Sequence, residues 1–168
     1  LLHHVYSTSG NRQNGIIGVS YMNFFKSIFN SQQHQNYSEN ATGKFADTAW
    51  SNKEHKKITD EYFPQMHSIE EDWSILYNLK DFSGERAHAL LQKCIENINL
   101  YKKMAKIEQA YGETPPPNAP AFKRLAMLYE KQGRYEESIS VCTDALKSGA
   151  WGDGMRPRLA RMIKKAGR

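Results

Sequence analysis

The stretch FKRLAMLYEKQGRYEESISVCTDA, residues 122–145, decides the fold of this chain. Its apolar residues recur at the 3.6-residue period of two helices, and Gln132-Gly133 stands between them as a helix-ending turn. A small residue on each helix, Ala126 and Ser138, would allow the two helices to approach closely. The stretch therefore predicts two antiparallel helices that pack against each other. The first apolar face comprises Phe122, Leu125, Ala126 and Tyr129, and the second comprises Tyr135, Ile139, Cys142, Ala145 and Leu146.

The spacing of these residues resembles one tetratricopeptide repeat, over residues 118–150. The chain departs from the family pattern at Ser138, Cys142 and Ala150, where the family commonly has Ala, an aromatic residue and Pro. The resemblance implies an all-α fold of antiparallel helical hairpins, a short α-solenoid in which neighbouring hairpins cover each other's apolar faces. The matching pattern is Phe122-x2-Leu125-Ala126-x2-Tyr129-x3-Gly133-x-Tyr135-x2-Ser138-x3-Cys142-x2-Ala145.

The remainder of the C-terminal half is assigned around this repeat. Ser83-Gly84 is a helix-start signal, and the apolar period that follows predicts a degenerate helix pair over residues 84–111. Met155–Ala166 is predicted to be the capping helix that such an array requires, after a turn at Gly152-Asp153-Gly154. Residues 84–168 are therefore predicted to form a tetratricopeptide-like helical domain. One side of the capping helix would carry Leu159, Met162, Ile163 and Ala166.

Residues 46–83 are predicted to be a helical segment that packs onto the first helix of that domain. Pro64 should end any helix that precedes it, because proline lacks an amide donor and its ring clashes with the preceding turn. Residues 1–45 are rich in Asn, Gln, Ser and His and are predicted to be a disordered or loosely packed segment, so that the N-terminal third is largely irregular. The strongest helical pattern of residues 46–83 places Ile69, Trp73, Leu76, Tyr77 and Leu79 on one side.

Positive charge is concentrated at the C-terminal end. The chain has a formal net charge of +5, and residues 147–168 hold seven Lys and Arg residues against one acid, Asp153. Such a cluster can attract nucleic acid, anionic lipid or an acidic protein surface, and the alternative is a solvated basic helix end that complements the helix dipole. Few aromatic residues interleave with these charges, so stacking on single-stranded bases is not predicted. The candidate anion or nucleic-acid contacts are Arg156, Arg158, Arg161, Lys164 and Lys165.

The resemblance to tetratricopeptide repeats also implies a binding surface. In that family, first-helix side chains that point away from the Leu125 face line a concave groove that holds extended peptides. Some members hold a C-terminal carboxylate with Lys, Arg and Asn from successive repeats, and only Lys123 fits that role here, so the resemblance does not imply that mode of binding. An ordinary charged helix face is the alternative. The predicted partner-binding residues are Lys123, Met127, Glu130 and Lys131.

No sequence motif for catalysis, a cofactor or a metal is present. Cys94 and Cys142 lie within apolar helical patterns without CxxC spacing, which indicates core thiols of a reducing compartment and therefore a cytoplasmic protein. The His and acidic residues between His55 and Asp72 lack the spacing of metal ligands. We therefore predict a non-enzymatic interaction scaffold that binds a protein or peptide partner. The alternatives are a nucleic-acid-associated protein that uses the basic C-terminal helix, and self-association through the open ends of a short array.

Overall fold

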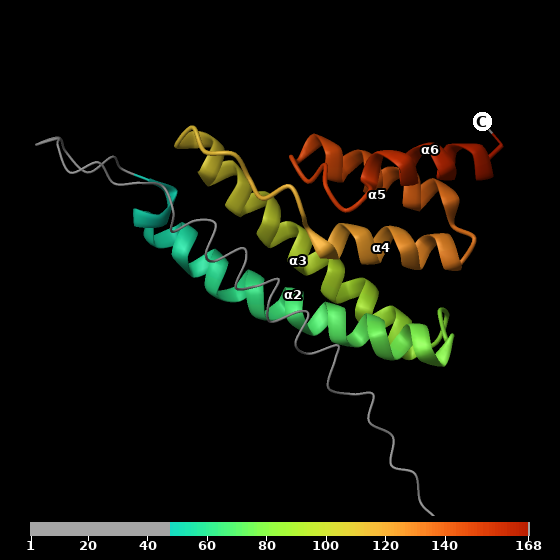
Figure 1. Cartoon of the computed structure of the whole chain (residues 1–168). Helices are drawn as coiled ribbons and strands as arrows, with labels where there is room; N and C mark the ends of the chain where they lie inside the picture. The colour runs from blue at the N-terminus through green and yellow to red at the C-terminus, as the bar shows by residue number, and fades with distance from the viewer. Residues whose placement is uncertain (1–47, 168) are drawn as a thin grey trace, which may run out of the picture. The chain divides into compact units, whose positions relative to one another are not determined.

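The computed structural model describes residues 48–167, and these residues form helices joined by short turns, without a strand (Figure 1). The predictions for residues 1–45 lie outside the described residues. A short 3₁₀ helix, η1, precedes five α-helices, and α2 and α3 run side by side as a long hairpin with α4, α5 and α6 beside it. The all-α prediction is confirmed. The bounds are η1 Ala49–Ser51, α2 Lys53–Leu79, α3 Glu85–Ala110, α4 Pro120–Lys131, α5 Tyr135–Lys147 and α6 Met155–Lys165.

The segment 84–111 contains one helix, α3 (Glu85–Ala110), so the predicted helix pair is wrong. No Gly or Pro interrupts Glu85–Ala110, and the buried stripe of Leu90, Cys94, Tyr101 and Met104 keeps one helical period along the whole length. Without a helix-breaking residue, the backbone hydrogen bonds continue through the middle of the segment. The hairpin partner of α3 is α2.

Helix α2 continues through Pro64, contrary to the prediction that this residue would break it. Pro64 is exposed, whereas Tyr62 before it and Met66 after it are both buried in the same core. Packing on α3 therefore outweighs the cost of about 3 kcal/mol that an interior proline carries. The buried Asn97 amide also donates from α3 to the Tyr62 carbonyl oxygen at 3.0 Å, two residues before the proline.

A buried ionisable pair joins the start of α2 to the end of α3. His55 Nε2 lies 3.1 Å from Glu108 Oε1, and both side chains are almost completely buried. Burial raises the pKa of the Glu108 carboxyl above its ordinary value, against the lowering effect of the hydrogen bond with His55. The nearby Ala49 amide donates to Glu113 at 3.0 Å, which attaches η1 to the same end of α3.

Helices α4 and α5 form the hairpin that the sequence predicts. Ala126 and Ser138 are completely buried where the helices meet, and the Ser138 hydroxyl donates to the Ala126 carbonyl oxygen at 2.9 Å. Gly133 turns the chain with a φ of 73°, a left-handed conformation that glycine adopts without steric cost. The N-cap of α4 is Ala119.

Helix α6 packs mainly on α5 after the turn at residues 152–154. The turn is held by the Gly152 amide, which donates to the Pro117 carbonyl oxygen at 2.8 Å. Met155 and Met162 are buried in α6, whereas Leu159 is half-buried and Ile163 is exposed. The predicted apolar side of this helix is therefore only partly covered.

The close approach of α4 and α5 depends on the small size of Ser138. We expect Ser138→Leu to lower the free energy of unfolding by about 1–3 kcal/mol, because a larger side chain must displace α4. Ser140→Leu is the matched control, since Ser140 is exposed on the same helix, and it should change stability by less than about 0.5 kcal/mol. Urea unfolding measures both; equal effects of the two substitutions would contradict the assigned packing.

Candidate functional site

Side chains from α2, α4 and α6 surround an open pocket with a volume of about 360 Å³. We refer to it as the α2/α4/α6 pocket. The pocket brings together residues from two separate predictions. Three of the four predicted partner-binding residues line it, and so do three of the five predicted anion contacts. The remaining lining residue, Tyr77, is predicted only as part of the core. The lining residues are Tyr77 from α2, Met127, Glu130 and Lys131 from α4, and Arg158, Arg161 and Lys165 from α6.

The other predicted site residues lie elsewhere. Lys123 Nζ is 3.3 Å from Asp153 Oδ1, so this lysine pairs with the turn before α6 and does not line the pocket. Arg156 and Lys164 are exposed on α6, and neither contributes to the pocket. The structure therefore divides the basic residues of α6 into an inward group and an outward group.

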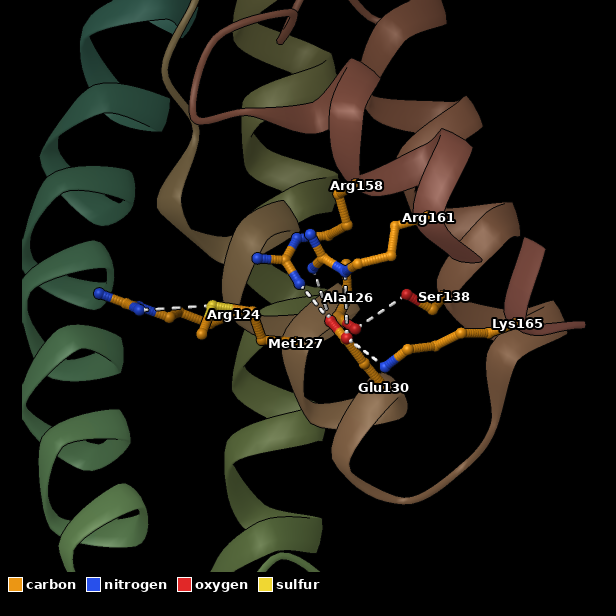
Figure 2. Close-up of polar contacts among 8 residues, drawn as sticks. All are labelled: Arg124, Ala126, Met127, Glu130, Ser138, Arg158, Arg161 and Lys165. Carbon is orange, nitrogen blue, oxygen red and sulfur yellow. Dashed lines mark hydrogen bonds and ion pairs between the residues drawn. The ribbon is translucent and has the colours of Figure 1, made fainter. Parts of the chain in front are cut away.

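Glu130 lies at the centre of the inward group, the Glu130 cluster, which Figure 2 shows with the cations of α6 around one carboxylate. Arg158 Nη1 donates to Oε2 at 2.6 Å, and Arg161 Nη2 donates to the same oxygen at 3.0 Å. Lys165 Nζ donates to Oε1 at 2.9 Å. One carboxylate of α4 therefore fixes three cations that are spread over two turns of α6.

The cluster changes the acidity of its members. Burial acts to raise the pKa of Glu130, but hydrogen bonds and charges of Arg161 and Lys165 outweigh it and hold this pKa at about 2. Burial lowers the pKa of Arg158, the most enclosed of the cations, and its Nε atom is buried without a hydrogen-bond partner. The hydrogen bond to Glu130 raises the pKa of Arg161. Glu130 is therefore ionised at neutral pH, and the cluster retains a positive charge.

An aromatic wall borders the cluster on the α2 side. Lys131 Nζ lies 5.4 Å from the ring centroids of both Tyr77 and Phe82, which are cation–π distances. Tyr77 is 49% exposed and Leu79 is 59% exposed, so the prediction that they share the buried side with Trp73 is wrong for both. Tyr77 instead presents its ring to the pocket, because its neighbour Leu76 occupies the buried position.

Helix α4 is also joined to α2 by an ion pair that the sequence did not reveal. The Arg124 guanidinium donates to both carboxylate oxygens of Glu70, with the Nε–Oε1 distance at 2.7 Å. Its Cζ atom lies 5.3 Å from the centre of the Trp73 ring, and its Nη1 group reaches the Met127 sulfur at 3.6 Å. This pair holds two walls of the pocket together. Arg124 and Glu70 are 54 residues apart, and no local pattern links them.

The pocket is chemically suited to hold an anion beside an apolar group. Its lining has four cationic side chains and one carboxylate, which leaves a net charge of +3. Arg161 and Lys165 keep 47% and 42% of their side-chain surfaces exposed, so unused N–H donors remain accessible. Tyr77 and Met127 supply aromatic and apolar surface beside those donors.

Two further properties concern residues 48–167. No group of three His, Cys, Asp or Glu side chains there is placed to hold a metal ion. None of the helices described has the length and apolar character that a membrane crossing requires. Comparison of the chain with family models, curated proteins and solved structures gave no match.

The low pKa of Glu130 predicts a specific loss of stability in acid. A carboxyl whose pKa is lower in the folded than in the unfolded state stabilises the fold at pH values above its unfolded-state pKa of 4.5. This stabilisation is lost as the pH falls toward the folded-state pKa of about 2. We expect a contribution of about 1–3 kcal/mol, reduced because two of the paired cations are partly exposed to solvent.

Glu130→Gln should therefore flatten the dependence of the free energy of unfolding on pH between pH 4.5 and 2. Glu137→Gln is the control, because it removes a carboxylate from a more exposed pair with Arg134. Urea unfolding at a series of pH values provides the measurement. The assigned cluster would be wrong if both variants lost the same part of the acid dependence.

Proposed function

We propose that this chain is a non-catalytic interaction module that binds an acidic segment of a partner protein in the α2/α4/α6 pocket. The observation that carries the proposal is the net charge of +3 in a cavity bordered by the exposed ring of Tyr77. Complementary charge steers an acidic partner toward the site, and burial of an adjacent apolar residue would supply affinity. In this proposal Lys131, Arg161 and Lys165 contact acidic groups, and Tyr77 and Met127 contact the apolar residue.

The order of the helices supports a groove of tetratricopeptide type. Two hairpins, α2/α3 and α4/α5, are followed by α6, and the first helix of each unit contributes to the same pocket. The resemblance over residues 118–150 provides an independent reason to expect peptide binding on this side of α4. The free, buried thiols of Cys94 and Cys142 support a reducing compartment such as the cytoplasm.

The contacts of α6 make nucleic acid the less favoured ligand. Three of its five candidate cations are already bonded to Glu130, and only Arg156 and Lys164 stand outside the cluster. Binding along a phosphate backbone needs several free cations in a row, and each one adds to the dependence of affinity on salt. An acidic peptide needs fewer free cations and uses the aromatic wall as well.

The proposal predicts that binding of an acidic peptide depends on the pocket cations and not on total charge. The probe is a fluorescein-labelled decapeptide of Glu and Asp with one central Leu, and the measurement is fluorescence polarisation with the full chain. Arg161→Gln and Lys131→Gln should each weaken binding five- to ten-fold, through the loss of about one charge-assisted contact.

The matched controls are Arg86→Gln and Lys103→Gln, which remove the same charges from exposed positions on α3 and should change affinity less than two-fold. If pocket and control variants weakened peptide binding equally, the attraction would be non-specific and the proposal would be contradicted. Tight binding of a labelled RNA or DNA oligonucleotide that is lost on Arg156→Gln and Lys164→Gln would favour the nucleic-acid alternative instead.

A further inference from the structure

We infer that the α2/α4/α6 pocket receives a phosphorylated side chain of the bound segment. This inference rests on the proposed function, because it names the acidic group that the segment inserts. The first reason is charge. A single carboxylate of a ligand would leave the +3 lining with most of its charge uncompensated, whereas a phosphate monoester carries about −1.5 to −2 at pH 7.

The second reason is the supply of hydrogen-bond donors. Arg161 gives Nε and one Nη2 hydrogen to Glu130, so the rest of its five N–H groups remain for a ligand. Lys165 gives one of three donors, and the side chains of both residues are almost half exposed. A phosphate group has three strong acceptor oxygens, which can use several of these donors at once.

The third reason is that Glu130 fixes the cations before any ligand arrives. Its Oε2 accepts from Arg158 and Arg161, and its Oε1 accepts from Arg161 and Lys165, so little side-chain freedom is lost on binding. A ligand carboxylate has one charge and two acceptor oxygens, so it would use only some of the donors that Glu130 leaves free. A phosphate, with more charge and more acceptors, gains from the donors that Glu130 leaves unused.

A phosphopeptide fits the site better than other sources of phosphate. The pocket of about 360 Å³ is bordered by Tyr77 and Met127, which suits one phosphoryl group and the side chain of a neighbouring residue. A nucleic acid would present a line of phosphates, and the outward cations of α6 in the described part of the chain, Arg156 and Lys164, are too few to follow one.

Three labelled decapeptides test the inference, identical except for phosphoserine, glutamate or serine at one position of an acidic sequence. With the full chain, fluorescence polarisation should show that the phosphoserine peptide binds at least five-fold more tightly than the glutamate peptide. This preference should disappear in Arg161→Gln and in Lys165→Gln, and should persist in Arg86→Gln. Circular dichroism confirms that each variant is folded, and Lys131→Gln replaces any variant that is not.

A second readout separates a dianion from a simple negative charge. Lowering the pH from 7.5 to 5.5 protonates phosphoserine, whose second pKa is about 6, and should reduce its advantage over glutamate. Glu130, with a pKa of about 2, keeps its charge over this range.

The outcomes distinguish the two proposals. Equal binding of the phosphoserine and glutamate peptides, both tighter than the serine peptide, would overturn the phosphate inference and leave the proposed function standing. Failure of all three peptides to bind would overturn both proposals. Binding of free inorganic phosphate as tightly as the phosphoserine peptide would show that the segment adds nothing, and would also overturn the inference.

Discussion

The carboxylate of Glu130 is the group on which the position of α6 depends. Helix α6 buries only Met155 and Met162 completely, and burial of two such side chains contributes roughly 3–6 kcal/mol. The charge-assisted hydrogen bonds of Glu130 to α6 add about 1–3 kcal/mol in total to this packing, because two of the three cations are partly exposed to solvent. Without them, Arg158 would remain enclosed beside α4 with no counter-charge, which is costly in a partly buried site. The same bonds that dock the helix also form the cationic side of the pocket, so the stability of α6 and the proposed binding would use one set of contacts.

A second ion pair fixes the opposite wall. Arg124 and Glu70 join α4 to α2 with bidentate geometry, and the guanidinium also lies over the Trp73 ring. Bidentate pairs are geometrically more specific than single contacts, so this one sets the position of α4 along α2. Helix α4 is therefore attached to α2 on one side and to α6 on the other. The pocket lies between these two attachments, which fix the helices that line it.

Local sequence signals predicted those helices whose turn and packing residues lie within one short stretch of sequence. Gly133 and the small pair Ala126 and Ser138 specified the α4/α5 hairpin, because the turn and the packing both lie within one short stretch. The prediction that Pro64 ends a helix was wrong, because the residues beside Pro64 do not show how strongly α2 packs along α3. The candidate site also combines residues that local patterns indicate with contacts between distant residues. The repeat pattern pointed to Met127, Glu130 and Lys131, which line one pocket, whereas the contact of Glu130 with Arg161 joins residues 31 positions apart and depends on the fold.

The most direct test of this account is hydrogen exchange of the α6 amides in Glu130→Gln and Glu137→Gln. Both substitutions replace a paired carboxylate by an amide of the same shape, but only Glu130 contacts α6. If Glu130 holds α6 in place, its amides should exchange about ten-fold faster in Glu130→Gln, equivalent to roughly 1.4 kcal/mol, and at the wild-type rate in Glu137→Gln. Unchanged protection of α6 in both variants would contradict the account, because the helix would then be held by its apolar contacts alone.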